Sequence, residues 1–269
     1  MRSMGLRTSI AVFAIAAFTA PALAQQPPAP FQPELGQKGK DVQWVPTPQA
    51  LVEKMLDKAA VTSKDYLVDL GSGDGVLVIA AARRGVRSMG IEYDGRLVDL
   101  SKRNAAAAGV ASLTRFVRGD IFKTDFSKAT VVTTFLLPSL NLQLRPTILA
   151  MKPGTRVVSN TFPMGDWEPD DTVTLDGPCE RWCKALFWIV PARVAGAWRT
   201  PKGELTLTQK FQTVAGSLGQ DPIADGRLRG DEITFTAGGA TYTGRVQDFR
   251  MTVKSVVDGR AVEWMAVRR

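Results

Sequence analysis

The 269-residue sequence contains no histidine, and this absence excludes several kinds of chemistry. Catalysis by Ser-His-Asp or Cys-His groups requires an imidazole, and histidine is also the commonest metal ligand in proteins. The sequence has only two cysteines, Cys179 and Cys183, which are too few for a four-cysteine zinc site. We therefore expect neither a metal site nor a nucleophile activated by histidine.

The two cysteines leave two possibilities open. Their spacing brings Cys179 and Cys183 near each other if the stretch between them is helical. In an oxidising compartment they would form one disulfide, and otherwise they would remain two buried thiols. Spacing alone does not choose between these states.

The sequence also lacks an apolar run of the about 20 residues that a membrane-spanning helix needs. The run at residues 10–18 is shorter, follows Arg2 and Arg7, and is succeeded by small residues that end at Ala24. This pattern is typical of a secretory signal peptide, residues 1–24, with cleavage after Ala24. We expect an exported protein, periplasmic or extracellular. The alternative is a protein anchored in the membrane by an uncleaved leader.

No cluster of charge of one sign stands out. The 34 Lys and Arg residues exceed the 26 Asp and Glu residues, but they are scattered along the chain. Scattered charges indicate a solvated surface, and we infer no nucleic-acid partner from them. With 45% hydrophobic and 22% charged residues, the composition is that of a folded protein.

Short apolar runs alternate with helical stretches between residues 61 and 160, which is typical of a parallel sheet with crossover helices. Strands are expected at residues 66–70, 86–91, 113–117, 130–136 and 155–160. Helices are expected at residues 48–59, 76–84, 94–109 and 140–151. Residues 171–175 and 185–190 would add two strands, so we expect an α/β fold with a seven-stranded sheet and helices on both faces.

The helical pattern ends near Pro191, and the remainder reads as short strands of alternating apolar and polar residues. Turns are expected at residues 201–203, 237–239 and 258–259. The sequence therefore predicts an antiparallel β domain at residues 192–269, either a small barrel or a sheet. A proline-rich linker at residues 25–40 and an α/β domain at residues 41–191 would precede it.

A glycine-rich turn follows the first strand of the α/β domain. Such a turn lets the backbone approach a ligand and presents the amides of a helix N-terminus. The dinucleotide-binding fingerprint needs a third glycine where Val76 stands, so the pattern is G-x-G-x-G instead. The candidate binding residues in this turn are Asp69, Gly71, Ser72, Gly73 and Gly75.

The G-x-G-x-G turn resembles motif I of class I S-adenosylmethionine-dependent methyltransferases, in which it holds the methionine end of the cofactor. Glu92 lies 21 residues after Gly71, where an acid accepts hydrogen bonds from ribose hydroxyls. Asp120 and Ile121 resemble the place where the superfamily reads the adenine. Thr47 is placed to close over the cofactor, although simple turns explain Thr47 and Asp120 as well. The resemblance implies S-adenosylmethionine as cofactor and a Rossmann-like methyltransferase sheet.

The resemblance covers nearly all of residues 45–198. The segments VPTP, GIE, LLPSLN and KPGTRVVS at residues 45–48, 90–92, 136–141 and 152–159 are similar to a group of bacterial methyltransferase-domain proteins. That group is similar to the mitochondrial lysine methyltransferases of the ATP synthase c-ring protein and the ADP/ATP carrier. The resemblance implies a protein lysine as acceptor, membrane-associated in those cases. The leader and the β domain have no counterpart in the mitochondrial enzymes.

Methyl transfer to nitrogen depends mainly on positioning and a water-poor site. Asn141 is our candidate for orienting the acceptor nitrogen, with the backbone carbonyls of Leu137 and Pro138 beside it. A helix-capping role for Asn141 is the other interpretation. We expect an S-adenosylmethionine-dependent methyltransferase that acts on a protein amine. A small-molecule methyltransferase and an exported, non-catalytic protein whose β domain binds an apolar ligand or a partner are the alternatives, and the oligomeric state stays open.

Overall fold

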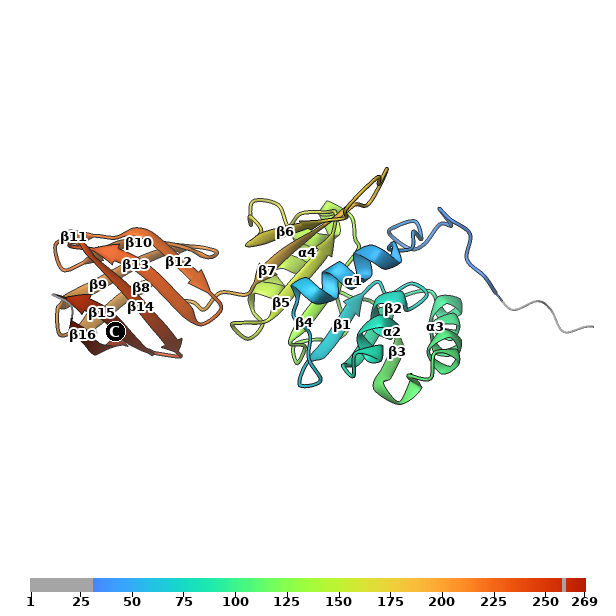
Figure 1. Cartoon of the computed structure of the whole chain (residues 1–269), viewed down its shortest axis with the longest axis horizontal. Coiled ribbons are helices and arrows are strands. Elements are labelled where there is room, and N and C mark those ends of the chain that lie inside the picture. Colours follow the sequence, from blue (N-terminus) through green and yellow to red (C-terminus); the bar gives the residue numbers. More distant parts are fainter. Residues whose placement is uncertain (1–30, 258–259) are drawn as a thin grey trace, which may run out of the picture. The chain divides into compact units, whose positions relative to one another are not determined.

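The computed structural model describes residues 31–257 and 260–269, which contain two separate sheets (Figure 1). The predicted signal peptide at residues 1–24 and the predicted turn at residues 258–259 lie outside the described residues. Among the described residues, none of the helices has the length and apolar character needed to cross a membrane.

The first sheet has seven strands in the order β3-β2-β1-β4-β5-β7-β6, which confirms the predicted methyltransferase fold. Its strands are β1 (Tyr66–Leu70), β2 (Arg87–Glu92), β3 (Thr114–Arg118), β4 (Val131–Thr134), β5 (Arg156–Asn160), β6 (Asp171–Thr174) and β7 (Lys184–Ile189). Strands β1 to β5 are parallel, whereas β7 runs antiparallel to β5, and β6 antiparallel to β7. The carboxyl ends of the parallel strands therefore share one edge of the sheet, where ligands bind in open α/β folds.

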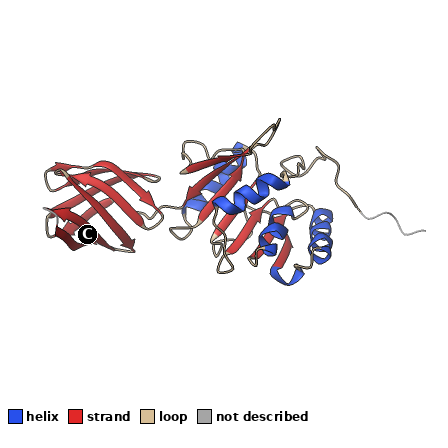
Figure 2. Cartoon of the chain, viewed as in Figure 1, coloured by secondary structure: helices blue, strands red, loops and turns tan. Residues whose placement is uncertain are grey.

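Helices cover both faces of this sheet (Figure 2). They are α1 (Gln49–Lys58), α2 (Val76–Arg83), α3 (Gly95–Ala107) and α4 (Pro138–Leu149), with a short 3₁₀ helix at Ala111–Leu113. Val68 and Val132 pack in one core with Leu144 of α4, whereas Leu67 and Val131 pack in a second core with α1 and α2. Successive strand residues face opposite ways, so the continuous apolar runs of β1 and β4 supply both cores.

The C-terminal sheet closes into a barrel, one of the two predicted forms, because β9 pairs with both β8 and β10. Its strands are β8 (Gly196–Thr200), β9 (Gly203–Lys210), β10 (Thr213–Leu218), β12 (Ala224–Arg229), β13 (Glu232–Ala237), β14 (Ala240–Gln247), β15 (Arg250–Val257) and β16 (Arg260–Arg268), with β11 (Asp221–Pro222) added at β10. The interior is filled by large buried side chains, among them Trp198, Phe235, Tyr242 and Trp264. Closure leaves no long unpaired edge in the ring formed by the described strands.

Candidate functional site

The glycine turn between β1 and α2 adopts a conformation that ordinary residues avoid. Gly71, Gly73 and Gly75 have φ angles of +79°, +55° and +85°, in the left-handed region. A Cβ on Gly73 would lie 3.0 Å from Nε1 of Trp44, and one on Gly71 would lie 3.1 Å from a methyl group of Leu136. Glycine is therefore required both by the backbone and by the space above the turn.

Glu92, at the end of β2, ties this turn to the next strand. Its carboxylate accepts hydrogen bonds from the backbone N–H groups of Gly73 (3.0 Å) and Asp94 (2.9 Å). From α3, the Ser101 hydroxyl donates to the carbonyl of Gly73 (2.9 Å), and the Asn104 amide donates to that of Asp74 (3.0 Å). Burial raises the pKa of Glu92 above its usual value. Each carboxylate oxygen keeps a further lone pair, so Glu92 has acceptor capacity left for a ligand.

Two buried polar groups lie beneath the turn. Asp69, on β1, accepts a hydrogen bond from the Thr133 hydroxyl (2.6 Å), and burial raises its pKa to about 7. Ser72 is 4% exposed, and its hydroxyl has no hydrogen-bond partner among the described residues. Because buried polar groups normally have a partner, an unpaired hydroxyl in a cavity wall fits a ligand-binding role.

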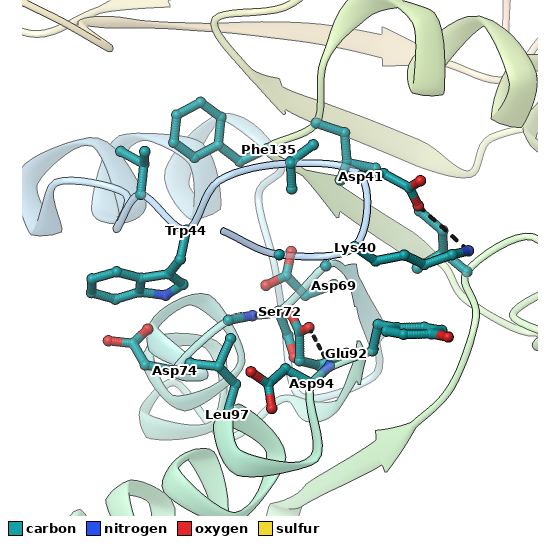
Figure 3. Close-up of a pocket in the computed structure, with 18 of the residues that line it drawn as sticks. Lys40, Asp41, Trp44, Asp69, Ser72, Asp74, Glu92, Asp94, Leu97 and Phe135 are labelled. Atoms are coloured by element: carbon teal, nitrogen blue, oxygen red, sulfur yellow. Dashed lines mark hydrogen bonds and ion pairs between the residues drawn. The ribbon is translucent and has the colours of Figure 1, made fainter. Parts of the chain in front are cut away.

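Residues 37–47 pass over the turn and cover it (Figure 3). Within this cover, Trp44 lies against Gly73, and the Thr47 hydroxyl accepts a hydrogen bond from Asn160 (3.2 Å). The Lys40 ammonium pairs with Asp120 (3.1 Å) and lies 4.9 Å from the ring centroid of Tyr93. The backbone N–H of Phe122 and the Lys40 ammonium lower the pKa of Asp120.

The structure brings the predicted cofactor residues together around one cavity. Gly75 is the exception, because it is the N-cap of α2 and does not line the cavity. The predicted residues that do line it are Thr47, Asp69, Gly71, Ser72, Gly73, Glu92, Asp120 and Ile121. Lys40, Trp44 and Tyr93 line it as well, although sequence reasoning did not propose them. Because the predicted linker at residues 25–40 includes Lys40, its last residues overlap the cavity wall.

The predicted acceptor residues lie at the start of α4. Asn141 is fully buried, and its amide nitrogen lies within 3.4 Å of the Ser159 hydroxyl, 3.2 Å of the Phe162 carbonyl and 3.3 Å of the Pro163 carbonyl. The Leu137 carbonyl accepts hydrogen bonds from the first turn of α4, whose first residue is Pro138. Asn141 thus fixes the segment after β5, and its contact with an acceptor stays a prediction.

Comparison with known proteins identifies the kind of site. Residues 69–171 match the family model described as the ANTKMT methyltransferase domain. A protein-lysine N-methyltransferase of Saccharolobus islandicus is 38% identical over 50% of this chain and 86% of its own length. The human lysine N-methyltransferase that is named for the c-ring protein of ATP synthase is 33% identical over 68% of this chain and 79% of its own length.

A solved structure shares the α/β domain. It is described as an RNA methyltransferase from Salinibacter ruber in complex with S-adenosylhomocysteine, and it is 49% identical, with a TM-score of 0.53, over 56% of this chain and 96% of that chain.

The cavity fits S-adenosylmethionine, a cation with a ribose and an adenine. The glycine turn leaves room for close approach of the backbone, and Ser72 offers an unpaired hydroxyl. Asp69 and Glu92 supply carboxylates, which suit hydroxyl donors and positive charge. The chain is an S-adenosylmethionine-dependent methyltransferase and belongs to the family that carries the ANTKMT methyltransferase domain.

Proposed function

We propose that this chain methylates the side-chain nitrogen of a protein lysine. The observation that carries the proposal is the similarity, over most of their lengths, to enzymes that are protein-lysine N-methyltransferases. The intact turn and its hydrogen bonds to Glu92 support a working cofactor site, which a purely structural copy of the fold would not need.

We assign the parts of the cofactor to the residues around the cavity. Glu92 would accept hydrogen bonds from the ribose hydroxyls, and Asp120 with Ile121 would bind the adenine. The Lys40 ammonium holds Asp120, so Lys40 would exchange its partner when the adenine binds. When bound, S-adenosylmethionine supplies an electrophilic methyl group to the amine, and the electron pair of the broken carbon–sulfur bond stays on sulfur. Residues 37–47 would exclude water above the turn.

The acceptor class is tested by finding which atoms receive the methyl group. The chain is incubated with S-adenosylmethionine labelled in the methyl group and with bacterial envelope proteins or, separately, with total RNA. We expect the label in methylated lysine after acid hydrolysis, and none with a Gly73→Arg variant. RNA is the competing acceptor because of the description of the Salinibacter ruber protein. Label confined to nucleosides or to small molecules would contradict the lysine proposal.

We further propose that the chain is exported, with residues 1–24 as its cleaved signal peptide. The disulfide between Cys179 and Cys183 supports export, because disulfides persist in oxidising compartments. The test is the mass of the mature chain after expression in a bacterial host. A periplasmic chain that begins at Gln25 is the expected result, and a cytoplasmic chain that retains residues 1–24 would contradict it.

We assign the β domain to recognition of the acceptor protein. The alternative, an exported carrier of an apolar ligand, needs a cavity inside the barrel. Side chains instead occupy the interior, where Phe235 stacks on Tyr242 with 5.0 Å between ring centroids, and Tyr242 contacts Trp264. Such packing favours a rigid element that presents its outer surface.

A further inference from the structure

A second cavity, of about 490 Å³, adjoins the cofactor cavity. The two cavities share Phe135 and much of the cover, including Lys40, Asp41 and Val45. The wall that belongs to the second cavity alone includes Leu137, Phe162 and Trp182. Phe135 therefore marks the junction at which a group in the second cavity would approach the cofactor.

Three aromatic rings from three distant segments form this wall. Phe135 follows β4, Phe162 follows β5, and Trp182 precedes β7. Ring centroids are 5.2 Å apart for Phe135 and Trp182, 5.6 Å for Phe162 and Trp182, and 6.1 Å for Phe135 and Phe162. All three side chains are half-buried, so the cluster leaves ring surface available to the cavity. Aromatic faces attract cations and pack well against aliphatic chains.

The backbone holds two of these rings firmly. The Phe162 carbonyl accepts hydrogen bonds from the Ser159 hydroxyl (2.7 Å) and the Asn141 amide (3.2 Å). Phe135 directly follows the fully buried end of β4. Both rings therefore depend on the sheet and on α4 for their positions.

Trp182 depends on a different constraint. It has a φ angle of +60°, which is unfavourable for a bulky side chain and persists only where the surroundings fix it. The adjacent residue, Cys183, forms a disulfide with Cys179, and its carbonyl accepts a hydrogen bond from the N–H of Leu175 (2.8 Å). The disulfide thus closes a short loop in the hairpin between β6 and β7, with Trp182 inside the loop. The stretch is not helical, so the cysteines meet without the helix on which their predicted proximity depended.

We propose that the second cavity binds the aliphatic stem and amine of the acceptor lysine, and that the Cys179–Cys183 disulfide keeps this pocket competent by holding Trp182 against Phe135 and Phe162. This inference rests on the proposed lysine acceptor.

The wall suits both stages of the reaction. Lys38 and Lys40 lie in the cover beside the aromatic wall, and neighbouring positive charge together with desolvation favours the neutral, nucleophilic form of an incoming amine. The acceptor nitrogen gains positive charge as its bond to the methyl carbon forms, and aromatic faces stabilise that charge. The methylated ammonium then releases one proton to solvent.

The test uses Nα-acetyl-lysine amide as the probe, added to the chain in the presence of S-adenosylhomocysteine and followed by NMR. We expect the probe to bind the oxidised chain and to lose about tenfold or more in affinity in Trp182→Ala, since cation–π and packing contributions of this size are typical. Reduction of the disulfide and the double substitution Cys179→Ser with Cys183→Ser should have the same effect. Trp182→Phe should restore most of the affinity, whereas Phe249→Ala, at an exposed aromatic residue of the β domain, should change nothing.

Calorimetry with S-adenosylhomocysteine runs in parallel and should give unchanged affinity in all these variants. Failure of the oxidised chain to bind the probe, or binding that ignores Trp182 and the disulfide, would overturn the inference. Loss of S-adenosylhomocysteine binding in the cysteine variant would also overturn it, because the disulfide would then support the whole domain and not one pocket. Methyl-lysine that forms regardless of Trp182 would leave the proposed function standing and refute only this inference.

Discussion

Asp69 is the buried carboxyl group of the cofactor cavity, and its protonation links stability to pH. It is 5% exposed, and burial raises its pKa from 3.8 to about 7 against the opposing hydrogen bond from Thr133. The folded chain therefore keeps a proton that the unfolded chain has already released. The stabilisation from this group is complete below the unfolded pKa and is lost as the pH rises through about 7.

The substitution Asp69→Asn removes this pH dependence. One pKa unit corresponds to about 1.4 kcal/mol, so the whole shift amounts to about 4 kcal/mol. Integrated between about pH 5 and about pH 8, the loss in the wild type is roughly 2.5 kcal/mol. Asparagine still accepts the hydrogen bond from Thr133 but does not ionise. Raising the pH over this range should therefore stabilise the variant relative to the wild type by about 2.5 kcal/mol.

Urea unfolding at the two pH values measures this difference. The helical signal in far-UV circular dichroism follows the α/β domain, because the described residues of the β domain form strands only. A difference between wild type and variant that stays constant with pH would refute the reasoning. The same variant should lose preference for S-adenosylmethionine over S-adenosylhomocysteine at the higher pH, because the former carries one more positive charge.

Three further substitutions test the turn and the barrel. Glu92→Ala removes the acceptor of two backbone N–H groups and should weaken S-adenosylhomocysteine binding roughly tenfold or more in calorimetry; unchanged affinity would count against the assigned role. Gly90→Ala would place a Cβ 2.5 Å from the Ser72 hydroxyl, and urea unfolding should show a loss of about 1–3 kcal/mol unless β2 relaxes freely. Phe235→Ala should cost the barrel about 3–5 kcal/mol, measured by thermal unfolding, while a loss of cofactor binding would contradict its confinement to the β domain.

Much of the fold follows from local sequence patterns. The strands of the first sheet begin and end within two residues of their predicted positions, because each is a short apolar run between turn residues. Helix α3 begins after Asp94, whose side chain accepts a hydrogen bond from the N–H of Arg96, as expected for an N-cap. The glycine turn is also predictable, since its spacing reflects a backbone requirement.

The rest of the site depends on contacts between distant residues. Lys40 meets Asp120 across 80 positions in the sequence, and no local pattern encodes that pairing. Helix α4 begins at Pro138, two residues before its predicted start, because proline is well suited to a first helical turn. This places Asn141 inside the helix, on the same buried side as Leu144. The position of Trp182 requires both the disulfide and the hairpin, and the spacing of the cysteines alone indicates neither.

The most direct test of the cofactor site is calorimetric titration of the chain with S-adenosylmethionine and S-adenosylhomocysteine, with Gly73→Arg as control. Any side chain at Gly73 would meet Trp44, so the control should not bind while the folded wild type binds both ligands with micromolar affinity. A folded wild type that binds neither ligand, or a Gly73→Arg variant that binds as well as the wild type, would contradict the assignment of this cavity to the cofactor.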